Sequence, residues 1–116
     1  MSTQTLMTAA ENFVALYHAD SKLCADQMDW DCVVRLQAAN APQQVTLDVR
    51  KGSVHAVTTD SKECDLIVTS TLQILMDILH LRLNPNQPYL FGELTLAGRE
   101  ADFMRVDYIA SMLCAP

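Results

Sequence analysis

The chain has 116 residues, of which 50% are hydrophobic and 19% are charged, a composition that is typical of one globular domain and excludes a disordered segment. Its formal net charge of −6 repels phosphate backbones, so we expect no nucleic-acid partner and at most transient contact with a membrane. The sequence has no basic N-terminal region followed by an apolar run, and no stretch of about 18 apolar residues. We therefore expect a cytoplasmic protein with a single domain over residues 1–116.

The predicted elements begin with a helix from about Thr5 to about His18, whose apolar residues recur at helical spacing. One face of this helix is formed by Leu6, Ala10, Phe13, Val14 and Tyr17. A second, short helical turn is expected over residues 20–26.

The middle of the chain alternates between apolar and polar residues with period two, which indicates strands. The first strand covers residues 32–38 and ends at a break at Asn40-Ala41-Pro42. Residues 45–50 and 54–58 form a hairpin around Lys51-Gly52, because glycine tolerates a positive φ. A fourth strand is expected over residues 64–69. Three consecutive antiparallel strands with half-polar alternation predict a sheet that is covered on one face only.

The last third of the chain is predicted to form a helix, a strand and a helix. Ser70 or Thr71 is a suitable N-cap for a helix from Leu72 to about Leu83, because a hydroxyl can accept a hydrogen bond from an unpaired backbone N–H. The prolines at 85 and 88 cannot continue that helix. Residues 89–97 indicate a fifth strand, interrupted by Gly92, and residues 99–113 indicate the final helix.

The helix after Thr71 carries more apolar surface than one sheet can cover. Its polar residues Gln73, Asp77 and His80 form a narrow stripe, and apolar side chains occupy most of the remaining circumference. Packing onto a sheet needs an apolar arc of only about 100°. Another helix, a second subunit or a ligand must therefore cover the rest.

The final helix has two apolar stripes. Phe103, Val106, Ile109, Ala110 and Leu113 form one face, and a second stripe at i, i+4 and i+8 consists of Met104, Tyr108 and Met112. Methionine is flexible and polarizable, which suits an adaptable cavity wall. The alternative is that both stripes are ordinary core or a contact between two subunits.

Groups that could carry catalysis are sparse. No nucleophile motif, phosphate loop or dinucleotide fingerprint occurs, and the four cysteines lack the spacing of a zinc site. We therefore expect reduced, buried thiols, no metal, no cofactor and no enzymatic activity. The residues that could act as an acid or base are His18, His55, His80, Asp29 and Asp31, and we expect solvent-facing or structural positions for them.

Several segments in order resemble the sterol carrier protein type 2 domain, in the form of a small bacterial single-domain member. They are Cys64-Asp65-Leu66-Ile67-Val68, a Leu- and Met-rich helix, Leu83-Asn84-Pro85, and the strand from Phe91-Gly92 to Ala97-Gly98. The hairpin from Val45 to Thr58 also matches, so the resemblance covers roughly residues 30–113.

The resemblance implies an α+β fold with a five-stranded, mainly antiparallel sheet, helices packed on one face, and an apolar tunnel between sheet and helices. Family members bind fatty acids, fatty acyl-CoA, sterols or other lipids, so we expect a hydrophobic small-molecule ligand that is transferred or presented to partners. The alternative is an accessory dimerisation or scaffold module, for example in isoprenoid quinone synthesis, with a homodimer through the apolar helices.

The surplus apolar surface and the resemblance together predict which side chains touch the ligand. We expect them to converge on a void of at least a few hundred Å³, the usual size of a ligand pocket. The predicted ligand-binding residues are Leu72, Leu75, Met76, Leu79, Phe91, Phe103, Met104, Tyr108 and Met112.

Overall fold

The structure, a computed structural model, describes residues 5–59 and 63–114. Within these residues, short helices and strands alternate with tight connections. In chain order the elements are α1 (Leu6–His18), α2 (Ser21–Asp26), β1 (Cys32–Ala38), β2 (Gln44–Arg50), β3 (Ser53–Thr58), β4 (Leu66–Ser70), α3 (Leu72–Leu79), α4 (Asn86–Leu90), β5 (Leu94–Gly98) and α5 (Glu100–Cys114). The first two helices, the hairpin and the last helix agree closely with the sequence-based expectation.

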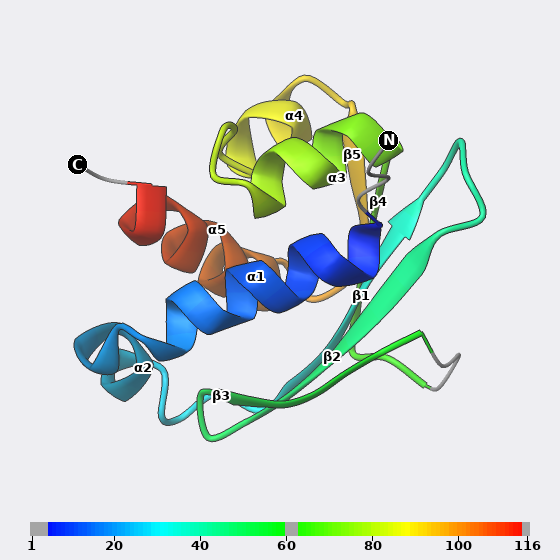
Figure 1. The fold of residues 1–116 in the computed structure, drawn as a ribbon. Helices are drawn as coiled ribbons and strands as arrows, with labels where there is room; N and C mark the ends of the chain where they lie inside the picture. The colour runs from blue at the N-terminus through cyan, green and yellow to red at the C-terminus, as the bar shows by residue number, and fades with distance from the viewer. Residues whose placement is uncertain (1–4, 60–62, 115–116) are drawn as a thin grey trace.

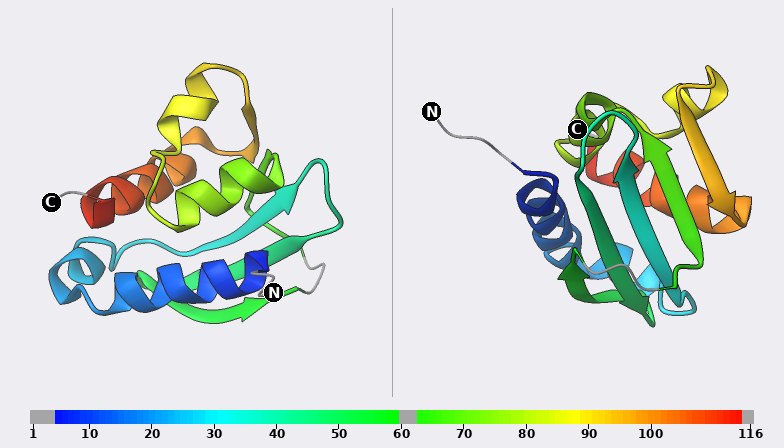
Figure 2. Two further views of the ribbon diagram at one scale, coloured as in Figure 1. Left: turned by 45° about the horizontal axis from the view of Figure 1, so that its top comes forward. Right: turned by 90° about the vertical axis from the view of Figure 1, so that its right-hand side faces the viewer.

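The five strands form one sheet in the order β3-β2-β1-β4-β5. Strands β1 and β4 are parallel, and the other neighbouring pairs are antiparallel. Helices α1, α3 and α5 lie against one face of this sheet, as Figure 1 shows and the two views of Figure 2 confirm. The predicted fold class, an α+β fold with a mainly antiparallel sheet and helices on one face, is therefore confirmed.

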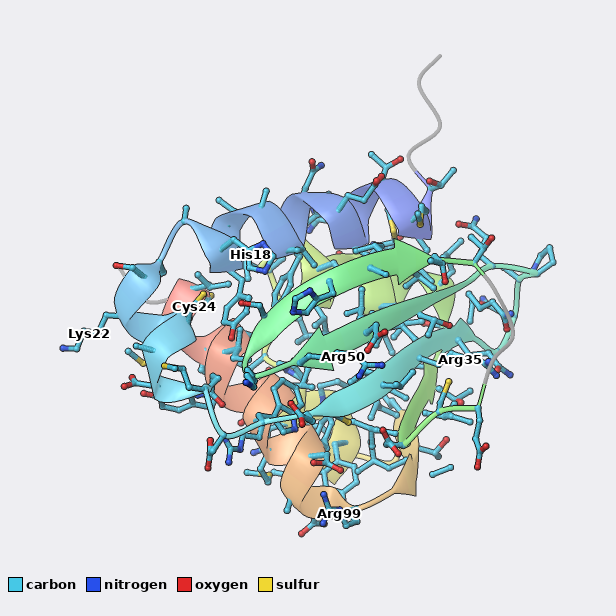
Figure 3. The ribbon with its side chains drawn as sticks, turned by 90° about the horizontal axis from the view of Figure 1, so that it is seen from below. His18, Lys22, Cys24, Arg35, Arg50 and Arg99 are labelled. Carbon is cyan, nitrogen blue, oxygen red and sulfur yellow. The ribbon has the colours of Figure 1, made fainter. Side chains whose placement is uncertain are left out.

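The two faces of the sheet differ in chemistry because side chains alternate along each strand. Along β1, residues 32, 34, 36 and 38 are buried toward the helices, whereas those between them are half-buried. The opposite face carries polar groups, among them Arg35 on β1 and Arg50 on β2 (Figure 3). Arg50 forms an ion pair with Asp48 at 3.3 Å on the same strand. The apolar core therefore lies on the helix side alone.

Side-chain caps set where the helices begin. Thr5, Asp20 and Thr71 each accept a hydrogen bond from the backbone N–H three residues further on, at the starts of α1, α2 and α3. Such a cap satisfies one of the donors that the first turn of a helix leaves unpaired. Of the two caps considered from sequence, Thr71 is the one used.

Helix α3 is shorter than predicted. It ends at Leu79, and Leu81 adopts a positive φ of 62°. The N–H of Arg82 donates to the carbonyl of Asp77 at 2.8 Å, and the N–H of Leu81 donates to Ile78 at 3.0 Å, which is a Schellman ending. Glycine usually marks this position, so a leucine there gave the sequence pattern no stop signal.

The segment after α3 also differs from the prediction. Tyr89 and Leu90 belong to the short helix α4 and not to a strand, and β5 starts only at Leu94. Proline is tolerated in the first turn of a helix, where its missing N–H has no partner to lose. Pro85 and Pro88 therefore stand at the start of α4 and do not end α3, which has already stopped at Leu79.

Candidate functional site

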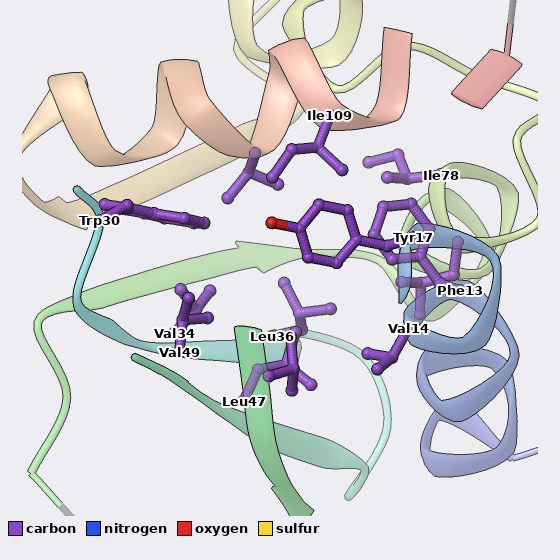
Figure 4. A pocket seen from close by; sticks show the side chains of 13 residues that line it. Phe13, Val14, Tyr17, Trp30, Val34, Leu36, Leu47, Val49, Ile78 and Ile109 are labelled. Atoms are coloured by element: carbon purple, nitrogen blue, oxygen red, sulfur yellow. The ribbon is translucent and has the colours of Figure 1, made fainter. Parts of the chain in front are cut away.

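An apolar cavity lies between the helices and the sheet (Figure 4). Its volume is about 60 Å³, and it has no polar lining surface. Its walls come from α1, α3, α5, the loop before β1, and strands β1, β2 and β3. The lining residues are Phe13, Val14, Tyr17, Trp30, Val34, Leu36, Leu47, Val49, Val54, Ile78, Leu79, Val106 and Ile109.

The cavity is smaller than the few hundred Å³ expected from sequence. A single water molecule needs about 10–15 Å³ of such a volume, so this conformation has room for a few small groups and not for a long acyl chain. A continuous tunnel remains a prediction. Because α1, α3 and α5 form one side of the cavity and the sheet forms the other, outward movement of a helix would enlarge it.

Local structure points the lining side chains inward. On α1, Phe13 and Val14 are about 100° apart around the helix axis and Tyr17 projects between their directions, so all three share the buried face. On the strands, alternation places every second residue of β1 and β2 on the helix side. The cavity is thus the place where three helices and the middle of the sheet fail to close completely.

The polar atoms of the aromatic lining residues are already bonded to protein. The Tyr17 hydroxyl, which points toward Trp30 in Figure 4, donates to the carbonyl of Gly52. The Trp30 Nε1–H donates to the buried carboxylate of Asp102 at 3.1 Å. Burial, with a contribution from the nearby Cys24, raises the pKa of Tyr17 well above its usual value, so the phenol stays protonated.

Gly52 allows the hairpin to approach this end of the cavity. Its φ is 77°, and a Cβ atom built there would lie 2.5 Å from the carbonyl oxygen of Gln27. A contact that short cannot be accommodated without moving backbone. The β2–β3 turn is therefore packed directly against the end of α2, where it receives the Tyr17 hydrogen bond.

A charged group lies beside this end. Arg105 donates from Nη1 to Asp29 Oδ1 at 2.8 Å and from Nη2 to Asp29 Oδ2 at 3.0 Å. Nη1 also donates to Gln27 Oε1 at 2.9 Å. The Arg105 hydrogen bonds and charge lower the pKa of Asp29, which keeps the carboxylate ionised and paired.

The structure does not bring the predicted ligand-binding residues together. Leu79 lines the cavity, Leu75 and Phe103 are buried in the core outside it, and Leu72 and Met76 pack against the core while half-buried. The other four are exposed, with fractions of 74% for Phe91, 45% for Met104, 43% for Tyr108 and 49% for Met112. Contact of these residues with a ligand remains a prediction.

The sequence-based list omitted most of the lining. The apolar face of α1 was visible in the pattern, as were the alternating residues of β1 and β2. Periodicity shows that such a face is covered, but it does not distinguish a packed core from the wall of a cavity. Trp30 gave no periodic signal, because it lies in a loop.

The candidate acid–base residues lie apart and have structural contacts. The N–H of Val54 donates to Nε2 of His18 at 3.1 Å, and the N–H of Lys51 donates to Asp31 at 2.7 Å. His80 is the C-cap of α3, and His55 is exposed on β3. Among residues 5–59 and 63–114, no three His, Cys, Asp or Glu side chains form a group that could hold a metal ion.

The thiols are only partly as expected. All four cysteines are free, and Cys32 alone is buried, whereas Cys24 and Cys64 are half-buried and Cys114 is exposed. Burial, and then the nearby Asp102 and Asp65, raise the pKa of Cys32 to about 12.

In the described part of the chain, no helix is both long and apolar enough to span a bilayer.

Comparison of the sequence with curated proteins gives no match. The model of the SCP-2 sterol transfer family, however, matches residues 11–109. The chain belongs to this family. The resemblance noted from sequence is thereby confirmed, and the match extends into α1, which the sequence motifs did not include. SCP-2 domains are lipid-binding and lipid-transfer domains, which agrees with the apolar cavity.

Solved SCP-2 structures share the fold at low identity. Sterol carrier protein 2 has a TM-score of 0.69 and 17% identity, with 91% of this chain and 93% of that chain covered. Palmitated SCP2L2 from Aedes aegypti has a TM-score of 0.66 and 18% identity, with 97% and 96% covered. The UbiJ-SCP2 ubiquinone synthesis protein has a TM-score of 0.65 and 16% identity, with 84% of each chain covered.

Proposed function

We propose that this SCP-2 protein binds the hydrocarbon chain of a fatty or isoprenoid lipid in the cavity between α1, α3, α5 and the sheet, and hands the lipid to a partner. The observation that carries the proposal is the lining, which is made of apolar surface from three helices and three strands. A hydrocarbon chain gains free energy there by leaving water. A polar ligand would find no unused hydrogen-bonding group on the cavity wall.

Binding requires the cavity to expand from about 60 Å³. We propose that α3 moves, because it is short, it is followed by the irregular segment around Leu81, and it contributes Ile78 and Leu79 to the wall. The side chains that become wall in the enlarged state then include more of α3. Leu72, Leu75 and Met76 are proposed as ligand contacts in that state.

We propose no catalytic step for this protein. The histidines and aspartates singled out from sequence have structural contacts or solvent-facing positions, and they do not converge on the cavity. A carrier should return its ligand unchanged. Acyl-CoA incubated with the pure protein should therefore be recovered without hydrolysis.

Native mass spectrometry of the freshly purified protein, followed by addition of palmitic acid, tests the binding proposal. We expect one added mass per protein chain. Leu79→Glu should abolish it, because a carboxylate in an apolar cavity is costly. The matched control is Leu90→Glu, at an exposed leucine on α4, which should keep the bound mass. A protein that remains empty at saturating palmitate contradicts the proposal.

The exposed apolar side chains favour a second candidate, an interaction module. Two exposed apolar side chains lie at the end of α4, Leu90 and its C-cap Phe91. The stripe on α5 is also uncovered in the single chain, and it consists of Met104, Tyr108 and Met112. A homodimer or an accessory complex, as in isoprenoid quinone synthesis, would cover them. In the same spectra, an empty dimer that dissociates on replacing Tyr108 and Met112 by serine would support this candidate instead.

A further inference from the structure

One end of the cavity carries an arginine that stands between the interior and the surface. Arg105 precedes the lining residue Val106 on α5 and lies one helical turn before Ile109, another lining residue, so its side chain leaves the helix at the edge of the cavity-facing side without lining the cavity. It also lines a separate recess on the surface. The residues of that recess are Asp26, Gln27, Ala101, Met104, Arg105 and Tyr108.

Gln27 contacts both Arg105 in the surface recess and Trp30 in the cavity wall. Its side chain accepts from Arg105 at 2.9 Å and lines the recess, and its backbone carbonyl accepts from the N–H of Trp30, which lines the cavity, at 2.9 Å. Gln27 is itself 4% exposed, a buried polar side chain. The Arg105–Gln27 contact therefore lies between the surface recess and Trp30, a residue of the cavity wall.

The partner of Arg105 can be displaced. Asp29 sits in the loop between α2 and β1, its side chain is 74% exposed, and it holds the arginine through two parallel hydrogen bonds. Exposed ion pairs of this kind contribute little to stability, because water competes for both charges. The planar fork of a guanidinium fits any carboxylate equally well. Asp29 thus holds the position that a carboxylate on a ligand could take.

We propose that Arg105 receives the acidic head group of the lipid: the carboxylate of a fatty acid replaces that of Asp29, while the acyl chain enters the cavity beside Trp30 and Val106. This inference rests on the proposed function and adds a ligand class to it. Met104 and Tyr108, in the recess, then lie at the entrance and not inside the cavity.

The surrounding charges narrow the ligand class further. Arg99, the neighbouring arginine, contacts the buried Asp102 at 3.3 Å, and that carboxylate also accepts from Trp30. Asp26 lines the recess, and Asp29 remains nearby after it is displaced. A head group with several negative charges, such as the phosphates of an acyl-CoA, is repelled by this setting. A single carboxylate is balanced by Arg105 alone.

Two probes with the same tail test the inference: pyrene-dodecanoic acid and its methyl ester, titrated at pH 7 against the full chain. Arg105→Gln should weaken binding of the acid about tenfold, the size expected for a lost charge-assisted hydrogen-bonding pair. Asp29→Asn should strengthen binding of the acid, because the internal competitor loses its charge. Binding of the ester should change less than about twofold in both variants.

The matched controls are Arg50→Gln and Asp48→Asn, which break another arginine–aspartate pair, joined at 3.3 Å on β2 by residues that do not line the cavity. Both control variants should leave the binding of the acid and of the ester unchanged. Asp29→Asn retains Arg105, so it tests the head-group role even if Arg105→Gln unfolds. Equal losses of acid and ester in Arg105→Gln, or no gain of acid in Asp29→Asn, would overturn the head-group role while cavity binding stands. If neither probe binds the unmodified protein, the proposed function fails as well.

Discussion

Helix α5 has two apolar stripes, of which one is buried against the core and the other is exposed. On its inner side Phe103 is fully buried, and Val106 and Ile109 line the cavity. On its outer side Met104, Tyr108 and Met112 remain between two-fifths and half exposed. In sequence the two stripes look alike, and the methionine-containing one even looks better suited to an adaptable wall. Coverage by the sheet and by α1, not residue type, decides which stripe faces the interior.

Placing one charge on each stripe should break this comparison most strongly. Ile109→Glu puts a carboxylate against the cavity and should lower the free energy of unfolding by about 4 kcal/mol, because the charge has no partner there. Met112→Glu, three residues further on the exposed side, should change it by less than about 0.5 kcal/mol. Urea unfolding of the two variants measures the difference.

Ligand binding gives the same pair a second readout. Ile109→Glu should lose palmitate binding, and Met112→Glu should retain it. If Met112→Glu destabilises the protein as much as Ile109→Glu does, the outer stripe is covered in solution. The interaction module would then be the better account of α5.

The extent to which sequence could predict the molecule follows from what periodicity measures. The strands 32–38 and 44–58 and the long helices were predicted because alternation and helical spacing record which side of an element is covered. The end of α3 was missed because Leu81 takes the left-handed position usually held by glycine. The helix α4 was missed because Pro85 and Pro88 were interpreted only as breaks.

The site was predictable in kind and not in position. An apolar ligand site followed from surplus apolar surface and from the family motifs. The residues that line it could not be predicted, because a cavity is the space left by imperfect packing among elements that are far apart in sequence. Leu47 illustrates the limit: its place in the alternation of β2 predicts plain core, and it lines the cavity. The buried Asp102 on α5 is a second example, because its partners Trp30 and Arg99 become visible only in the folded chain.

Two glycines compare a packed turn with an open one: Gly52 lies in the β2–β3 turn against α2, and Gly92 lies after α4. Gly52 and Gly92 have nearly the same φ, 77° and 76°, but a Cβ on Gly92 would meet nothing within 4 Å. Gly92→Ala should therefore cost about 1 kcal/mol, the backbone penalty alone. Gly52→Ala should cost about 3 kcal/mol, because the methyl group also collides with the Gln27 carbonyl.

Thermal or urea unfolding of these two variants decides whether the hairpin packs against α2 as described. Equal costs would mean that the turn can move away from Gln27 freely. Gly52→Ala should also weaken lipid binding, since it displaces the carbonyl that holds the Tyr17 hydroxyl.

Cysteine reactivity compares the buried inner face of the sheet with the exposed end of α5, and it needs no mutation. Cys32 is buried on the inner face of β1 with a pKa raised to about 12, and Cys114 is exposed at the end of α5. At pH 8, Cys32 should react with a thiol reagent more than about 100-fold more slowly than Cys114, since the thiolate is the reacting form. Peptide mapping after timed labelling assigns the rates, and similar rates would show that the inner face opens readily.

The smallest effect is expected from the pH dependence of the Arg105–Asp29 ion pair. Arg105 lowers the pKa of Asp29, so the pair stabilises the folded state above the ordinary aspartate pKa of about 3.9. That contribution is lost as the pH falls through the lowered pKa of the folded state. The difference in urea midpoint between the unmodified protein and Asp29→Asn should therefore be constant from neutral pH down to about pH 4 and shrink below it. A difference that grows on acidification contradicts the pairing.

The most direct test of the central claim uses Trp30, the one tryptophan of the chain, which lines the cavity. Tryptophan fluorescence is measured while a dibrominated stearic acid, whose bromines quench at contact, is titrated in parallel with unbrominated stearic acid. If the acyl chain lies in the cavity, the brominated acid should quench Trp30 to saturation at one ligand per chain, and the unbrominated acid should not. A brominated acid that binds by native mass spectrometry and leaves Trp30 unquenched would contradict the account and place the ligand on the outer surface.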